Sequence, residues 1–326
     1  MKKISIILAL LMIATLAFGL ISYASGSGYE YTNDEALDHN EDEINESDMT
    51  LFLAFFYGII QGVSEFLPIS SSGHLVLGYH ITGLDAESFL AFDILLHVGT
   101  LVAVIFVYFK DIAALFPAFF TMIKKVCTGH LKFADYTVNE RLVILLIIAT
   151  APLALAVLPF MSGLNAVRGS LIFVGAALIV NGFILFVSDR ISRAKHNIET
   201  LKPRHAVVAG LCQFLAIVPG LSRSGTTITG GLFAGMDRAT AVKFSFLMSI
   251  PAIIGASVMH LPDFFREVPS MSNLVIYLIG AVVAAIVGFF AIKLLQYIAK
   301  KSNFTMFSYY CWTVGAIALV WGLIIR

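Results

Sequence analysis

Long apolar segments separated by short polar connections make up most of the chain. They lie at about 51–68, 89–109, 142–160, 169–187, 206–219, 244–261, 274–295 and 306–325. Several approach the roughly 20 residues that a helix needs to cross the hydrocarbon core of a bilayer. The pattern therefore predicts an all-α polytopic membrane protein whose membrane domain extends over residues 51–326.

Composition supports this prediction and narrows the expected partners. Hydrophobic residues form 59% of the chain and charged residues 13%, whereas soluble domains carry roughly 25% charged residues. The basic residues lie at the ends of apolar segments, without interleaved aromatic residues, so we expect membrane lipids and no nucleic acid as partners. The three cysteines are far apart in the sequence and indicate neither a disulfide framework nor a metal site.

The N-terminal region follows a different pattern. Two lysines precede an apolar stretch over residues 4–21, and Ser22-Tyr23-Ala24 resembles the cleavage site of a secretory signal. Residues 1–24 are thus expected to be a signal peptide or a retained signal anchor. Residues 25–50 contain nine acidic residues and no Lys or Arg. This segment is too hydrophilic to fold alone, and we expect it to be disordered and external.

The charges of the connections predict the orientation of the membrane domain. Lys and Arg gather in residues 110–141, 188–205 and 296–303, whereas the connections near 82–88, 161–168 and 262–273 have few cations. Because cationic connections stay in the cytoplasm, the first three should be cytoplasmic and the other three external. The chain is therefore expected to be a multi-pass protein of the cell membrane.

Two Gly/Ser/Thr-rich stretches, 68–88 and 219–243, interrupt the apolar pattern at corresponding places. At an offset of 152 residues, G-x-x-Q at 58–61 matches 210–213, S-x-S-G at 70–73 matches 222–225, and Phe92 matches Phe244. The loop charges give the two units opposite orientations. We therefore predict an inverted-topology repeat with units at about 51–109 and 203–261, and a site near their interface.

The first interrupted stretch, QGVSEFLPISSSGH over 61–74, concentrates polar groups inside an apolar region. Gln61 and Glu65 are four residues apart and share one face of a helix. Pro68 should end that helix, and we expect the serines and Gly73 to form a loop leading to His74. An ionisable residue inside a membrane segment is a candidate for function. The structural alternative is that Glu65 pairs with a nearby cation and that the serines only cap a helix.

The second stretch, PGLSRSGTT over 219–227, carries one fixed positive charge. The planar guanidinium of Arg223 suits a phosphate group. Hydroxyl donors and backbone N–H groups for an anion would come from Ser222, Ser224, Gly225, Thr226 and Thr227. A helix starting after Gly225 would favour an anion further, while the structural alternative is a basic cytoplasmic loop.

Other charged residues in the apolar regions receive a structural interpretation. His97 follows Asp93 by four residues, and we expect a hydrogen-bonded pair that packs against the first loop rather than a catalytic group. For Asp237, Arg238 and Lys243 we expect a structural ion pair or a cluster at the membrane edge.

The two motifs resemble the signatures of the undecaprenyl-diphosphate phosphatase family, also called the bacitracin-resistance protein family. The similarity covers about residues 51–326 and includes FDILLHVGTLVAV over 92–104. The resemblance implies two re-entrant helix–loop–helix elements in an inverted repeat, with a site that faces outward. It also implies catalytic roles for Glu65, Ser71, His74 and Arg223, with Ser70, Ser222, Ser224, Gly225 and Thr227 assisting at the substrate.

The family resemblance further implies a metal, Mg²⁺ or Ca²⁺, with Glu65 and Gln61 as ligands. Gln61 stands where the family often has Glu, and one carboxylate fewer weakens a site for a hard cation. The acidic segment 25–50 also departs from the usual family pattern.

The implied reaction is hydrolysis of a polyprenyl diphosphate to the monophosphate and phosphate, which recycles a lipid carrier for cell-envelope glycan synthesis. Attack by Ser71 and attack by an activated water both remain open, as does a homodimeric state. An inverted repeat with broken helices is also typical of secondary transporters. The alternative function is thus a lipid-phosphate flippase or a proton-coupled anion transporter.

Overall fold

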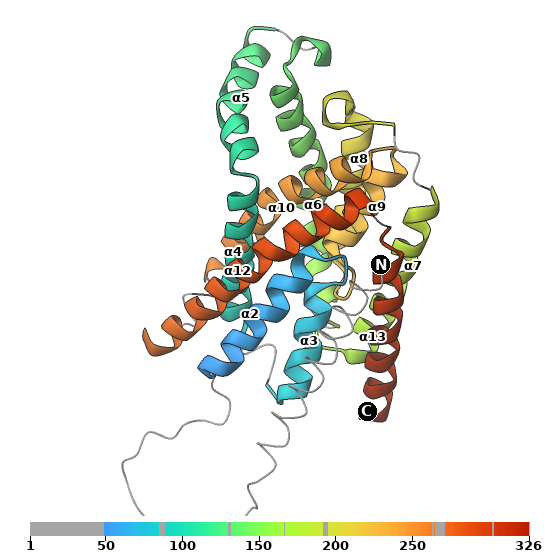
Figure 1. Ribbon diagram of the computed structural model, residues 1–326. Coiled ribbons are helices and arrows are strands. Elements are labelled where there is room, and N and C mark those ends of the chain that lie inside the picture. Colours follow the sequence, from blue (N-terminus) through green and yellow to red (C-terminus); the bar gives the residue numbers. More distant parts are fainter. Residues whose placement is uncertain are drawn as a thin grey trace, which may run out of the picture.

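The computed structural model describes residues 49–84, 89–129, 132–165, 167–191, 195–262, 264, 271–301 and 303–325. The expectations for residues 1–48 lie outside this part of the chain. Apart from two 3-10 turns and one isolated bridge, the regular structure of the described residues is α-helical (Figure 1).

Six helices of the described chain are long and apolar enough to span a membrane. They are α4 (Leu90–Val107), α6 (Val138–Asn165), α7 (Leu171–Ile191), α10 (Arg238–Met259), α12 (Met271–Lys301) and α13 (Thr305–Ile324). Each overlaps most of one predicted apolar segment, so the prediction of an all-α multi-pass membrane protein is confirmed.

The two remaining apolar segments, together with the two Gly/Ser/Thr-rich stretches, form two helix–loop–helix pairs. One pair is α2 (Leu51–Phe66) with α3 (Ser71–Thr82), and the other is α8 (Pro203–Leu215) with α9 (Arg223–Phe233). We call residues 67–70 the first loop and residues 216–222 the second loop. The predicted loop from Ser70 to His74 was wrong in extent, because α3 already begins at Ser71. Likewise α9 begins at Arg223, before Gly225.

The capping residues explain where these two short helices begin. The Ser70 hydroxyl accepts a hydrogen bond from the Gly73 N–H at 3.3 Å, and the Ser222 hydroxyl accepts one from the Gly225 N–H at 3.1 Å. Serine at the N-cap satisfies one of the free N–H groups of the first turn. The expected alternative role of the first-stretch serines as caps is therefore realised for Ser70, and Ser222 has the same role without having been predicted to. Ser70 also has a φ of 74°, a left-handed conformation that is uncommon for residues other than glycine.

Close helix contacts hold the first pair in the bundle. Gly58 and Gly62 on α2 face α12, and a Cβ added at Gly62 would lie 2.8 Å from the Ala284 carbonyl oxygen. Small residues four apart let two helices approach closely, which is a common packing device in membranes.

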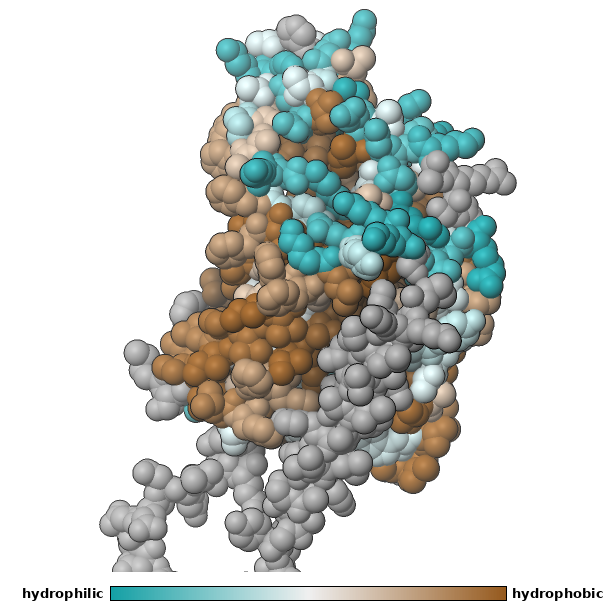
Figure 2. Space-filling model, viewed as in Figure 1, coloured by the Kyte–Doolittle hydropathy of each residue, from teal (hydrophilic) through white to brown (hydrophobic). Residues whose placement is uncertain are grey.

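A helix that the sequence did not predict lies within the cationic connection 110–141. α5 (Phe109–Cys127) follows α4 almost directly, and Figure 1 shows it rising with the start of α6 beyond the other helices. Its apolar face is exposed at Phe109, Phe116 and Phe120, and lysines between the aromatic residues made the segment read as a loop. Hydrophilic residues gather at this end of the visible face, and hydrophobic residues form a broad belt below it (Figure 2).

The charged residues at the start of α10 hold neighbouring elements. Arg238 pairs with Asp189 of α7 at 2.9 Å, and Lys243 pairs with Asp111 of α5 at 2.6 Å. Asp237 caps α10 by accepting a hydrogen bond from the Thr240 N–H. The expected structural role in ion pairs is confirmed for Arg238 and Lys243, with partners on α7 and α5, whereas Asp237 is a helix cap.

Candidate active site

A buried ion pair joins the two helix–loop–helix pairs. Glu65 lies in the last turn of α2, and its Oε1 pairs with the Nη2 of Arg223, the first residue of α9. The Arg223 Nη1 also donates to the Ser249 carbonyl oxygen of α10 at 3.3 Å. The sequence separates these two side chains by 158 residues, and the fold places the acid of one motif against the arginine of the other. The alternative that Glu65 pairs with a cation is therefore also realised.

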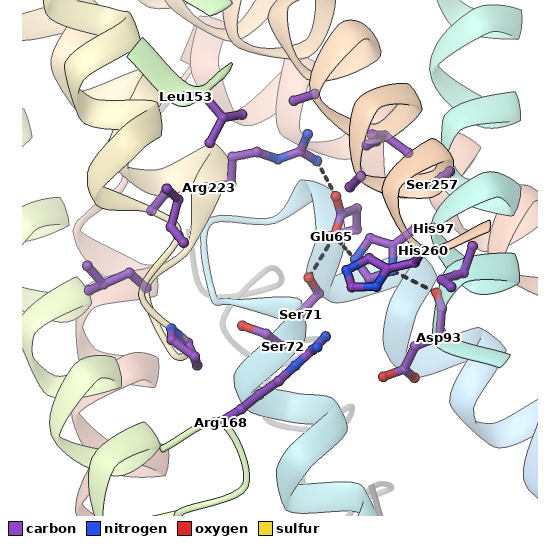
Figure 3. A pocket seen from close by; sticks show the side chains of 18 of the residues that line it. Glu65, Ser71, Ser72, Asp93, His97, Leu153, Arg168, Arg223, Ser257 and His260 are labelled. Atoms are coloured by element: carbon purple, nitrogen blue, oxygen red, sulfur yellow. Dashed lines mark hydrogen bonds and ion pairs between the residues drawn. The ribbon is translucent and has the colours of Figure 1, made fainter. Parts of the chain in front are cut away.

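Ser71 and His97 approach the other oxygen of the same carboxylate. The Ser71 hydroxyl, on the first residue of α3, donates to Glu65 Oε2 at 2.6 Å. The His97 Nε2, on α4, lies 3.7 Å from that oxygen. Figure 3 shows Ser71, His97 and Arg223 converging on Glu65 from three sides. A carboxylate that accepts a hydrogen bond from a serine hydroxyl can take up its proton and so activate the hydroxyl as a nucleophile.

His97 contacts Asp93, as the four-residue spacing predicted, through the main chain of that residue. Its Nδ1 lies 2.7 Å from the main-chain oxygen of Asp93, and the Asp93 carboxylate instead accepts a hydrogen bond from the Tyr79 hydroxyl at 2.6 Å. The expected hydrogen bond between His97 and Asp93 is thus present, but it runs to the main chain of Asp93 and not to its carboxylate. A single sequence gives the four-residue spacing but does not reveal which atom of Asp93 the imidazole contacts.

His74 lies away from the carboxylate. Its Nδ1 is 2.7 Å from the Ser70 carbonyl oxygen, and its Nε2 is 2.7 Å from the hydroxyl of Tyr310 on α13. Both ring nitrogens are therefore engaged with protein groups. This histidine braces the strained backbone at Ser70 and does not line the cavity described below.

The hydroxyl groups of the second motif make contacts within the protein. The Ser224 hydroxyl donates to the Leu67 carbonyl oxygen at 3.3 Å, and the Thr227 hydroxyl lies 2.6 Å from that of Ser245. Gly225 packs near Pro68, where an added Cβ would lie 3.3 Å from the proline Cβ. Ser224 and Gly225 therefore contact the first loop, whereas the Ser222 hydroxyl caps α9 and Thr227 joins α9 to α10.

A cavity of about 310 Å³ opens in front of this pair. Of the predicted residues, Glu65, Ser71 and Arg223 line it. Further polar lining comes from Ser72, Asp93, His97, Arg168, Gln213, Ser257 and His260. Apolar side chains such as Leu153, Ile217 and Ile253 complete the wall. The cavity is thus lined by both charged and apolar side chains.

Two of these lining residues carry features that the sequence analysis missed. Arg168 comes from the connection between α6 and α7 and points into the cavity past Ser72 (Figure 3). Gln213 is 2% exposed, and neither polar atom of its amide has a hydrogen-bond partner among the described residues. Gln213 is the counterpart of Gln61 in the predicted repeat. That match is the sequence feature that could have indicated Gln213 as a residue of the site.

The carboxylate has few companions that could hold a metal. The Gln61 Nε2 donates to Glu65 Oε2 at 3.2 Å, and the Gln61 Oε1 is buried without a partner among the described residues. The described chain contains no cluster of three or more His, Cys, Asp or Glu side chains that could hold a metal ion. One carboxylate and one amide oxygen fit a Mg²⁺-like ion that takes its other ligands from water and substrate phosphates.

The fold and the cavity define a multi-pass membrane protein with an internal polar site made by two opposed helix–loop–helix pairs. Residues 54–317 match the sequence model of the family described as bacitracin resistance protein BacA. The chain belongs to this family. It is 40% identical over 279 residues to an undecaprenyl-diphosphatase of Alkaliphilus metalliredigens, covering 85% of the chain and 100% of that protein.

Two other relatives, both undecaprenyl-diphosphatases, give the same picture. The protein of Desulforapulum autotrophicum is 38% identical over 280 residues, which covers 85% of the chain and 100% of that protein. The protein of Methanobrevibacter smithii is 40% identical over 274 residues, covering 83% of the chain and 98% of that protein. The similarity therefore extends over nearly the full length of these relatives.

Proposed function

We propose that the protein is an integral membrane phosphatase that hydrolyses undecaprenyl diphosphate, or a similar polyprenyl diphosphate, to the monophosphate and phosphate. This reaction recycles the lipid carrier for cell-envelope glycan synthesis. The observation that carries the proposal is the cavity-facing set of Glu65, Ser71 and Arg223. The names of the full-length relatives support the same activity.

The substrate head group would lie against Arg223. Glu65 neutralises this guanidinium in the structure, and a phosphate oxygen would take over one of its N–H donors. A preorganised arginine stabilises the negative charge that grows on the phosphoryl oxygens in the transition state. Mg²⁺ or Ca²⁺, held by Glu65 and Gln61, would supply further neutralisation of the diphosphate. The apolar wall with Leu153, Ile217 and Ile253 would accept the first prenyl units.

The Ser71 hydroxyl is the proposed nucleophile. Its proton already points to Glu65 Oε2, so the carboxylate can accept it as the oxygen attacks the terminal phosphorus. The new Ser–O–P bond forms while the bridging P–O bond breaks, and the lipid monophosphate leaves. Water then hydrolyses the seryl phosphate. Direct attack by water would use the same carboxylate, and trapping of ³²P on serine separates the two routes.

The placement of the histidines modifies the catalytic roles that the family resemblance implied. His74 stays a proposed essential residue, but its contacts with Ser70 and Tyr310 favour a role in shaping the first loop. His97 is the histidine that faces the carboxylate. Ser70, Ser222, Ser224, Gly225 and Thr227 would likewise act by holding the loops and aiming N–H groups.

The proposed topology is an inverted repeat in which both helix–loop–helix pairs are re-entrant and the site faces the external side. Arg168 supports this orientation, because it lines the cavity from the connection that the charge pattern places outside. Self-association as a homodimer also stays a proposal, which crosslinking in native membranes tests.

The rival function is a lipid-phosphate flippase or proton-coupled anion transporter, which two opposed broken segments also suit. Purified protein in detergent separates the two. A phosphatase releases phosphate from farnesyl diphosphate without a sealed membrane, and EDTA reports on the metal. A folded protein that releases none in detergent, with Mg²⁺ or Ca²⁺ present, would contradict the phosphatase.

A further inference from the structure

A single amide on a third helix contacts both loops of the site. Asn181 lies in the middle of α7 and is fully buried. Its Nδ2 donates to the Pro68 carbonyl oxygen of the first loop at 3.0 Å. Its Oδ1 accepts from the Ser222 N–H of the second loop at 3.2 Å. One side chain thus links two segments that are far apart in the sequence.

The two contacts lie close to the reacting groups along the chain. Pro68 stands three residues after Glu65 and three before Ser71, and Ser222 directly precedes Arg223. Ser222 is also the N-cap of α9. Fixing these two backbone groups therefore fixes the end of α2, the start of α3 and the start of α9. These are the three points that carry the carboxylate, the hydroxyl and the guanidinium.

The packing around the amide leaves little room for another arrangement. A Cβ added at Gly225 would lie 3.1 Å from the Asn181 Oδ1 and 3.3 Å from the Pro68 Cβ. Two direct hydrogen bonds link each loop to a helix of the other pair, from the Gly220 N–H to the Ser72 hydroxyl and from the Ser224 hydroxyl to the Leu67 carbonyl oxygen, and both are 3.3 Å long. The hydrogen bond from Asn181 to the first loop is shorter than these, at 3.0 Å, and Asn181 contacts both loops from a separate helix, α7.

We infer that Asn181 is a positioning residue that sets the separation of Glu65 and Ser71 from Arg223. The inference rests on the proposed phosphatase function. Only a side chain with a donor and an acceptor can serve both contacts. Leu has a similar volume but can serve neither. Asp keeps the acceptor for Ser222 and loses the donor for Pro68, whose buried carbonyl oxygen then keeps only the long hydrogen bond from the Cys311 thiol at 3.8 Å.

The test compares Asn181→Leu and Asn181→Asp with the matched control Ser188→Ala. Ser188 is buried on the same helix, and its hydroxyl donates to the Leu185 carbonyl oxygen within that helix at 2.7 Å. With farnesyl diphosphate in detergent, we expect kcat of both Asn181 variants to fall about 30-fold, since a misplacement of about 1 Å can cost ~10²-fold. KM should change less than about threefold, and Ser188→Ala should keep both wild-type constants. Circular dichroism and size exclusion establish that each variant is folded.

A double mutant separates positioning from general damage. If Asn181 acts through Arg223, the effects of the two changes should not be additive. Asn181→Leu should then lower kcat by a much smaller factor in the Arg223→Lys protein than in the wild type. The inference would be overturned if the kcat losses of the two single variants multiply fully in the double variant. It would also be overturned if a folded Asn181→Leu protein keeps the wild-type kcat. Asn181→Asp decides the same question should the Leu variant fail to fold. If the wild-type protein itself releases no phosphate, the proposed phosphatase function is overturned, and the role of Asn181 in it is overturned as well.

Discussion

Replacing Arg223 by alanine tests catalysis and stability at once. The Glu65 side chain is 5% exposed and the Arg223 side chain 22% exposed. Removing the guanidinium leaves a carboxylate buried without its main partner, and breaking such a pair costs about 3–5 kcal/mol. Because Ser71 and Gln61 still donate to Glu65, we expect the lower end of that range, about 3 kcal/mol.

The catalytic loss should be separate from the loss of stability. A preorganised donor aimed at developing charge contributes roughly 10²–10³ in kcat, so Arg223→Ala should reduce kcat by at least that factor. The double variant Glu65→Gln/Arg223→Ala no longer buries an unpaired charge. It should recover most of the lost thermal stability and none of the activity.

Phosphate release from farnesyl diphosphate and thermal unfolding in detergent measure the two effects. The single variant should lose both activity and stability, and the double variant should lose activity alone. A folded Arg223→Ala protein with wild-type phosphate release would refute the role of the ion pair. Equal instability of both variants would refute the argument from the buried carboxylate.

Three further predictions follow from the cavity. Ser71→Ala should lower kcat ~10³-fold or more if Ser71 is the nucleophile, as removal of triad nucleophiles does; a loss of only about tenfold would favour direct attack by water. Gln61→Glu adds a carboxylate beside Glu65 and should lower the Mg²⁺ concentration for half-maximal activity, and an unchanged or raised Mg²⁺ requirement would argue against metal ligation here. Arg168→Gln should raise KM about tenfold with little change in kcat, since a charge-assisted hydrogen bond contributes about 1.5–3 kcal/mol; an unchanged KM would remove Arg168 from substrate binding.

The membrane-spanning architecture could be read from the sequence because it follows from length and hydropathy alone. The prediction was incomplete where short helices carry polar residues. α3 and α9 contain serines, threonines and glycines that read as loops, yet Ser70 and Ser222 cap them and the bundle buries them. α5 was not predicted because its lysines made the segment look like a cytoplasmic connection, although one face of the helix is aromatic.

The sequence identified Glu65 and Arg223 as residues of the candidate site, but it did not predict how the residues of the site are arranged around them. Glu65 and Arg223 stand out because buried charges in a membrane need a reason and a partner. The roles of His74 and His97 depend on which helix face each occupies relative to α13 and α4, and one sequence does not contain that information. Asn181 was overlooked inside an apolar segment, although a lone amide in a span is itself a signal of a specific contact.

The most direct measurement of the central claim is release of the terminal phosphate from undecaprenyl diphosphate by purified protein in detergent. Wild-type protein and the folded variant Glu65→Gln/Arg223→Ala should be compared at equal concentration with Mg²⁺ present. The proposed site predicts stoichiometric phosphate and lipid monophosphate from the wild type, and at most a trace from the variant. Equal release from both proteins, or none from the wild type, would contradict it.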